Sequence, residues 1–229
     1  MEHKAPVKAI ALLVTISLAF SGCANTIPSR ADNAVRLHPN AVYPIRVFMF
    51  PFIDKRPPEQ KTAAEKISWP GTLGRVDFYG ENVENTLTDA LADYLTASRV
   101  FNQVHEIDMV TSESLLKQKG YRALLTGEIE EFQTSFTVPK WVLILTMLPI
   151  PTFGLTFIWP KAMEFNAVLN NVRLKDIETN QIIWTGKVEV HKTLTETTYH
   201  CSPKWFLGET GELLAKELVR ELAQAKLKF

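Results

Sequence analysis

Residues 165–192 read FNAVLNNVRLKDIETNQIIWTGKVEVHK, and this stretch decides the fold class. Apolar and polar side chains alternate along residues 165–175 and again along residues 182–192, which is the pattern of half-buried β-strands. The residues between them, 176–181, are polar and suit a hairpin turn. The stretch therefore predicts a β-hairpin with one buried face.

Outward from this hairpin, strand-type and helix-type patterns alternate along the chain. The predicted strands lie at residues 45–53, 100–107 and 121–137, the predicted helices at 81–98, 108–119 and 209–226, and a long loop rich in proline and glycine at 54–75. An apolar insert separates the strand at 121–137 from the hairpin. We expect an α/β fold, a mixed-sheet sandwich of order β-α-β-α-β-(apolar insert)-β-β-α.

The amino terminus has the organisation of a bacterial lipoprotein signal. Lys4 and Lys8 precede an apolar run of about 12 residues, which suits a signal-peptide core and is too short to span a bilayer. Small residues then lead directly to Cys23, a pattern that resembles a lipobox. We expect residues 1–22 to be a signal peptide and Cys23 to be the acylated first residue. The alternative is an ordinary secretory signal with an incidental cysteine.

Acylation at Cys23 would also set the location of the protein. Two or three acyl chains, such as palmitate, hold a protein on a membrane almost permanently. Because Ala24 rather than Asp follows the cysteine, we expect a lipid anchor in the outer membrane, with the protein on its periplasmic face. Residues 23–44 contain three prolines and predict a tether, and residues 45–229 predict a single domain.

The apolar insert spans residues 138–161. The 19 residues from Trp141 to Trp159 carry no charge, and Lys140 and Lys161 lie just outside them. Tryptophans at headgroup depth with lysines beyond them are typical of membrane-embedded segments. Two prolines and a glycine interrupt the insert, so we expect a hairpin that docks into one leaflet or into a membrane partner. A hairpin packed on the domain's own core is the alternative.

Composition and motifs exclude several functions. The 25 basic and 25 acidic residues balance, which argues against nucleic-acid binding. Two cysteines exclude a disulfide scaffold or a zinc ribbon. Nucleophile-elbow, phosphate-loop and HExxH motifs are absent from the sequence, so we expect no catalytic residue, no cofactor and no metal. Cys201 follows His200, but neighbours on an extended chain point in opposite directions, so we interpret it as an ordinary loop cysteine.

Four short motifs carry a resemblance to known lipoproteins. They are Pro51-Phe52 with Asp54, VFNQV at residues 100–104, ALLTGEIEEF at 123–132 and VRLKDIETNQIIWTGKVEV at 172–190. In this order the chain resembles the curli-secretion-channel and penicillin-binding-protein-activator lipoproteins. Their domains are similar to the N-terminal domain of the Tol-Pal translocation protein. The resemblance covers roughly residues 45–225 and implies a mixed α/β domain.

Together these observations predict a non-enzymatic, membrane-anchored lipoprotein. We expect it to be an accessory or scaffold in cell-envelope assembly or transport, to bind envelope proteins through its α/β domain, and to dock its apolar hairpin. The alternative is a subunit of an oligomeric outer-membrane secretion channel, and we keep a homo-oligomer open.

Overall fold

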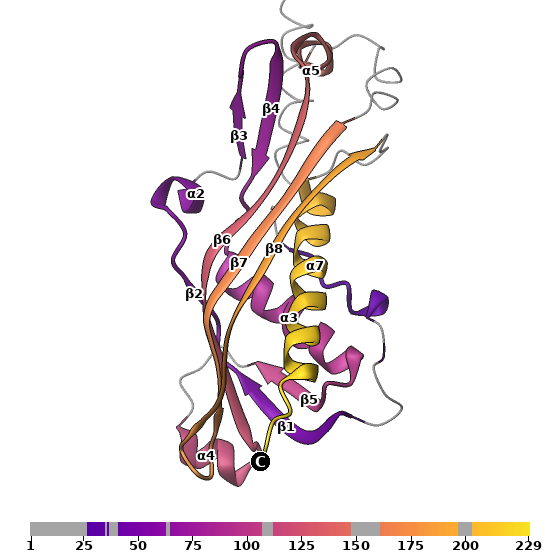
Figure 1. Cartoon of the computed structure of the whole chain (residues 1–229). Helices are drawn as coiled ribbons and strands as arrows, with labels where there is room; N and C mark the ends of the chain where they lie inside the picture. The colour runs from indigo at the N-terminus through magenta and orange to yellow at the C-terminus, as the bar shows by residue number, and fades with distance from the viewer. Residues whose placement is uncertain are drawn as a thin grey trace, which may run out of the picture.

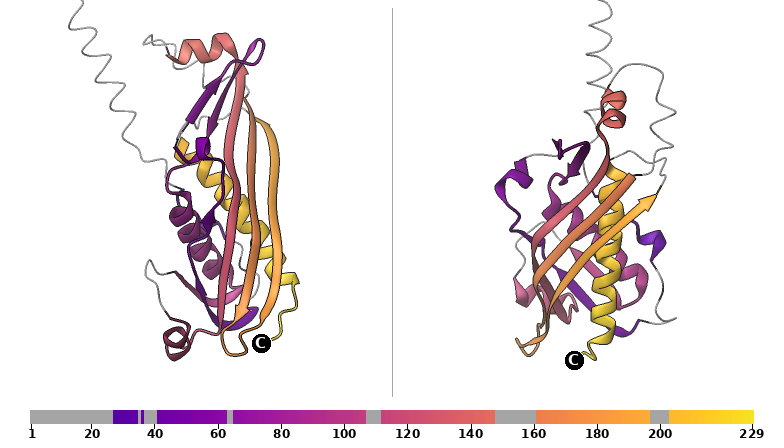
Figure 2. Two further views of the ribbon diagram at one scale, coloured as in Figure 1. Left: turned by 90° about the vertical axis from the view of Figure 1, so that its left-hand side faces the viewer. Right: turned by 45° about the horizontal axis from the view of Figure 1, so that its top comes forward.

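A long, curled mixed sheet forms the body of the molecule. Helices α3 (Val83–Ser98) and α7 (Pro203–Gln224) pack on one of its faces (Figures 1 and 2). The computed structural model describes residues 27–34, 36, 41–62, 65–106, 112–147, 161–196 and 203–229. The arrangement confirms the expected α/β fold with a mixed sheet and interleaved helices.

Strand β6 (Ala123–Pro139) is the centre of the sheet. One of its edges pairs in turn with the parallel strands β1 (Tyr43–Met49) and β2 (Ile53–Asp54) and with the antiparallel strand β4 (Leu73–Phe78). Its other edge pairs with β7 (Lys161–Asp176), which pairs with β8 (Ile182–Glu196). Strand β5 (Phe101–Glu106) pairs with β1, and strand β3 (Glu65–Ser68) pairs with β4.

Two irregularities between β6 and β7, of which the second places an extra residue in β6 and the first an extra residue in β7, accompany the change of phase in the apolar pattern of β6. The register with β7 shifts between Thr126 and Glu128 and again between Ile129 and Glu131. Such shifts add a residue to one strand and reset which side chains face inward. As a result, Ile129 and Phe132 are both fully buried although they are three positions apart.

The helices bury one apolar face each against the sheet. In α3, Leu87, Leu91 and Leu95 are fully buried, as the helical spacing predicts. In α7, which begins at Pro203 rather than near residue 209, Leu214 and the leucines that follow it on the same face are buried. These side chains and the inner face of β6 and β7 form one continuous core.

Helix α4 (Glu113–Gln118) is shorter than the expected helix at 108–119. Ser112 occupies its N-cap position, and Gly120 follows its end with φ of +79°. A positive φ costs glycine little, which is why glycine ends helices so often. The predicted end of the helix at Gly120 is therefore confirmed. The predicted start at residue 108 is wrong, because the described helix begins at Glu113 after the extended residue Ser112.

The expected long loop at 54–75 is also wrong, because most of it is regular structure. It contains β2, helix α2 (Pro58–Thr62), β3 and the start of β4. The first three residues of β3 are exposed, so β3 has no alternation of buried and exposed positions by which its sequence could be recognised. Its strand geometry comes from pairing with β4, which in turn pairs with β6.

Candidate functional site

Both ends of the apolar insert emerge at one end of the molecule. Thr137 of β6 pairs with Ala162 of β7, so the chain leaves the sheet and returns to it at neighbouring positions. Helix α5 (Lys140–Met147) follows β6 directly and lies beside the β3–β4 hairpin (Figure 1). We call α5 and residues 66–73 of the hairpin the tip.

Helix α5 has one buried and one exposed side. Val142 is 2% exposed and belongs to the core cluster, whereas Trp141 is 52% and Ile144 49% exposed. The helix is therefore fixed to the domain and presents apolar side chains to the surroundings. Trp159, the expected second frame residue, lies outside the described residues.

The two expected flanking lysines differ in their surroundings. Lys140 begins α5 and is half-buried, and its backbone N–H donates to the carbonyl of Thr72. Lys161 begins β7 and is only 4% exposed, with its ammonium 5.7 Å from the ring centroid of Phe136. An ammonium over an aromatic face gains cation–π attraction, so the aliphatic part and the charge of Lys161 both pack on the domain.

The β3–β4 hairpin is part of this end of the molecule and was not predicted from the sequence, which indicated a loop here. Its turn contains Pro70 and Gly71, with φ of +57° at Gly71, and the Leu73 N–H donates to the Pro70 carbonyl. This hydrogen bond makes Gly71 the second residue of a four-residue turn, where a positive φ is typical of the primed turns found in hairpins. The Pro-Gly pair was therefore a usable signal for a hairpin here.

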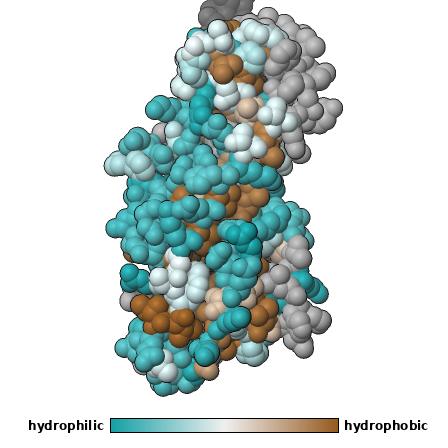
Figure 3. All heavy atoms as spheres, in the orientation of Figure 1, coloured by the Kyte–Doolittle hydropathy of each residue, from teal (hydrophilic) through white to brown (hydrophobic). Residues whose placement is uncertain are grey.

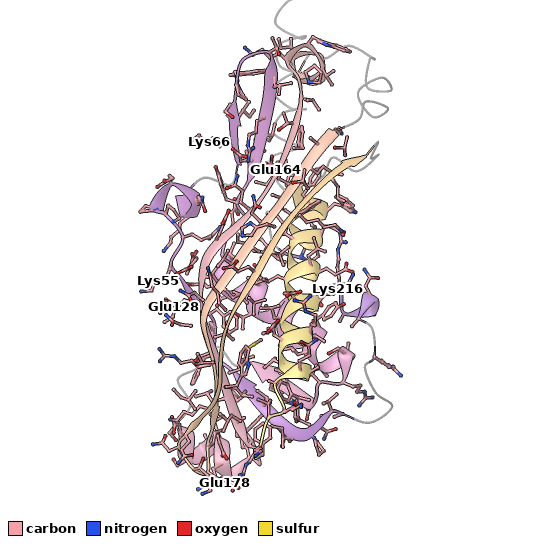
Figure 4. The ribbon with its side chains drawn as sticks, in the orientation of Figure 1. Lys55, Lys66, Glu128, Glu164, Glu178 and Lys216 are labelled. Atoms are coloured by element: carbon pink, nitrogen blue, oxygen red, sulfur yellow. The ribbon has the colours of Figure 1, made fainter. Side chains whose placement is uncertain are left out.

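A polar network fastens the base of this hairpin to the long strands. The guanidinium of Arg75 contacts Asp77 at 2.7 Å, Ser135 at 2.8 Å and Glu164 at 2.9 Å. Glu164 lies on β7 directly below the hairpin (Figure 4). Burial acts to lower the pKa of Arg75, but Asp77 and Glu164 outweigh it and the pKa is raised. The network therefore links β4, β6 and β7 with a permanently charged group.

Residues 27–34, within the expected tether, pack against α7. We call this segment the strap. Ile27 is 5% exposed and belongs to the core cluster. A Cβ on Gly208 would lie 2.6 Å from Cγ of Pro28, and one on Gly211 would lie 3.0 Å from Ile27. The two glycines thus create the space in which the strap crosses the helix.

Charged groups complete this attachment. Arg30 contacts Glu209 at 2.6 Å and Glu212 at 3.3 Å, and Asn33 donates to Glu212 at 2.9 Å. Burial tends to raise the pKa of Glu212, but hydrogen bonds from Lys216 and from the strap lower it overall. The strap is therefore held by both packing and charge. Cys23 lies outside the described residues.

The space created by Gly208 and Gly211 allows a direct test of how the strap is held on α7. We expect Gly208→Ala to lower the free energy of unfolding by about 1–3 kcal/mol, because the added methyl group overlaps the ring of Pro28. The higher helix propensity of alanine, worth about 1 kcal/mol, acts in the opposite direction. Urea denaturation measures the net change.

Adding Pro28→Ala in the same chain is the matched rescue, because it removes Cγ and Cδ of Pro28 and leaves Nε of Arg30, on a flexible side chain, as the remaining atom within 3.0 Å of the new methyl group. The double variant should recover most of the loss. Equal stability of Gly208→Ala and the parent chain would show that the strap is not held in the space at Gly208.

The described residues contain no helix that is both long and apolar enough to cross a membrane. Nor do they contain a group of three or more histidine, cysteine and acidic side chains that could hold a metal ion.

The sequence matches no protein-family model, and no curated protein is similar to it. Among solved structures, the fold is similar to protein XCC0632 of Xanthomonas campestris, from the family DUF330. The TM-score is 0.50 at 10% identity, over 87% of this chain and 94% of that one. This likeness concerns the fold and agrees with the α/β architecture.

Two further similar structures give lower scores. PelC from Paraburkholderia phytofirmans, a dodecamer, has a TM-score of 0.40 at 13% identity, over 82% of this chain and 94% of that one. Lipoprotein GNA1162 from Neisseria meningitidis has a TM-score of 0.34 at 15% identity, over 79% of this chain and 99% of that one. The resemblance to the curli-secretion, penicillin-binding-protein-activator and Tol-Pal group stays a prediction.

Proposed function

We propose that this protein is a non-enzymatic lipoprotein of the bacterial outer membrane, acting as an accessory or scaffold in envelope assembly or transport. Acylated Cys23 anchors it on the periplasmic side. The α/β domain binds envelope proteins, and the apolar segment 141–159 docks into lipid or into a membrane partner.

The observation that carries this proposal is the position of the apolar segment relative to the rigid sheet. Its described part, α5, is fixed by buried Val142 and exposes Trp141 and Ile144 at one extremity of an elongated molecule. An apolar surface placed there can contact a membrane while the long strands and helices remain accessible to proteins. Exposed apolar side chains gathered in one place generally mark an interaction surface.

The anchor is tested by Cys23→Ala in a chain that keeps its signal. We expect the membrane-bound fraction to fall by roughly tenfold or more, because no acyl chain then contributes to membrane binding. Cell fractionation and labelling with a radioactive fatty acid measure the change. Cys201→Ala is the matched control, since it removes the other cysteine, and it should change neither readout.

Partner binding is tested by crosslinking in intact cells from positions next to Trp141 and Trp159. Crosslinks to a small set of envelope proteins support the accessory role. Detergent-extracted rings in electron microscopy would instead support the channel-subunit alternative. Full membrane retention of Cys23→Ala would contradict the division of roles between the lipid anchor and the segment.

A further inference from the structure

The tip carries five of the large apolar side chains that the described residues expose. They come from two segments that are distant in sequence: Ile67 at 41%, Trp69 at 44% and Leu73 at 42% from the hairpin, and Trp141 at 52% and Ile144 at 49% from α5. In Figure 3 this end is coloured pale teal and white with a small brown area, and larger brown areas lie over the middle and the lower part of the molecule. The α5 pair belongs to the expected insert, whereas the hairpin residues have no role so far.

Hydrogen bonds join the two segments into one surface. Leu73 is the register partner of Pro139, the last residue before α5. The Lys140 N–H donates to the Thr72 carbonyl at 3.0 Å. The backbones of the turn and of the start of α5 are therefore held together, and the Arg75 network ties the base of the hairpin to β6 and β7.

The two charged residues of the tip are lysines. Residues 66–73 and 140–147 contain Lys66 and Lys140, and the exposed Glu65 directly precedes Lys66 at the start of β3. Lys66 is exposed and projects from β3 near the base of the tip (Figure 4). Exposed indoles beside lysines match the interfacial layer of a bilayer, where indoles sit among headgroups and ammonium groups meet anionic lipid.

A second copy of the chain fits this surface poorly. In a two-fold dimer through the tip the same patch meets itself, so the lysines of one copy would approach those of the other, and the acidic residue next to them in β3, Glu65, lies outside the tip at the start of that strand. Like charges brought together across an interface disfavour the complex. The charge pattern therefore favours an anionic lipid surface.

The strap is consistent with a membrane at this end. It crosses α7 at Gly208 and Gly211, in the half of the helix that begins nearer the tip (Figure 1). Four residue steps separate Cys23 from Ile27, a reach of about 14 Å when fully extended. An anchor on so short a connection would keep the amino-terminal half of α7 near the bilayer.

We infer that the β3–β4 turn, through Trp69 and Leu73, is a second membrane-contacting element that enters the headgroup region of an anionic bilayer beside α5. The inference deepens the proposed function and rests on it for the anchor, but the contact itself uses only residues of the tip.

The first experiment measures the depth of Trp69. The full-length lipidated protein is reconstituted in vesicles of phosphatidylethanolamine and phosphatidylglycerol with brominated acyl chains, which quench nearby indoles. We expect Trp69→Phe to remove at least about one fifth of the quenched emission, the share of one tryptophan among the five in the chain. Trp184→Phe, in half-buried β8, is the control and should remove none.

The second experiment uses the chain with Cys23→Ala, so that binding does not depend on the anchor. Adding Trp69→Glu should weaken its binding to the same vesicles roughly tenfold, because a carboxylate replaces an interfacial indole in a cationic patch. Ile182→Glu is the matched control: Ile182 is 54% exposed and lies at the opposite end of the sheet, next to the β7–β8 turn. Vesicle flotation measures both.

The outcomes separate this inference from the proposed function. Flotation of the lipidated protein with unquenched Trp69 overturns the inference and leaves the anchor intact. Binding of Cys23→Ala that depends on Trp69 supports the inference even if acylation fails. Equal effects of Trp69→Glu and Ile182→Glu overturn it, as does shielding of Trp69 that rises with protein concentration in the absence of lipid, since a second copy would then cover the tip.

Discussion

Replacing Phe206 with alanine is expected to lower the free energy of unfolding by about 3–5 kcal/mol. Phe206 of α7 is fully buried, and its ring stacks on Phe78 at 5.6 Å and on Phe136 at 5.8 Å between centroids. The three rings come from α7, β4 and β6. Removing the Phe206 ring therefore opens a cavity where the helix meets the base of the hairpin. Chemical denaturation measures the loss.

Leu115→Ala is the control for this prediction. Leu115 is 40% exposed on α4, far from the aromatic cluster, and its truncation should change stability by no more than about 0.5 kcal/mol. A loss below about 1 kcal/mol for Phe206→Ala would contradict the tight packing of helix on sheet described above.

Asp54→Ala is expected to cost about 3–5 kcal/mol, because it leaves the charge of Arg56 buried without its partner. Arg56 is 3% exposed, donates to Asp54 at 2.9 and 3.1 Å, and also donates to the carbonyl of Tyr79. Tyr79 directly follows β4, so this pair ties β2 to the foot of the hairpin. Replacing both partners, as in Asp54→Leu with Arg56→Met, should cost less than Asp54→Ala alone.

The pH dependence gives an independent check on the same pair. Burial tends to raise the pKa of Asp54, but the hydrogen bonds and charge of Arg56 outweigh it, and the pKa is lowered. A carboxyl with a lowered folded-state pKa contributes stability that is present above its unfolded pKa of about 3.9 and is lost as the pH falls through the folded value. The stability gap between the parent chain and Asp54→Asn should therefore narrow below about pH 4. A constant gap would contradict the ion pair.

Regular, half-buried elements could be predicted from the sequence. The β7–β8 hairpin and α3 follow from periodicity alone, because one face of each meets the core and the other meets solvent. The bulge in β6 appears in the sequence only as a change of phase near Ile129, since its geometry depends on the register with β7.

Two parts of the candidate site could not be predicted. Strand β3 has no alternation of buried and exposed residues, so nothing distinguishes it from a loop until β4 is in place. Likewise, Gly208 and Gly211 look unfavourable in a helix, and their role becomes clear only when the strap is seen to cross them. Trp141 and Lys140 could be named in advance because the charge-free run marks them, whereas Trp69 stands alone in its segment.

The docked strap has a consequence for how the protein would work in the envelope. Ile27 is packed in the core, and three residues of sequence separate it from Cys23, the proposed anchor. Acylated at Cys23 as proposed, the protein would stay next to its own membrane and would not reach across the periplasm. Its partners would therefore bind close to this membrane. A partner anchored in the opposite membrane would have to span the periplasm itself.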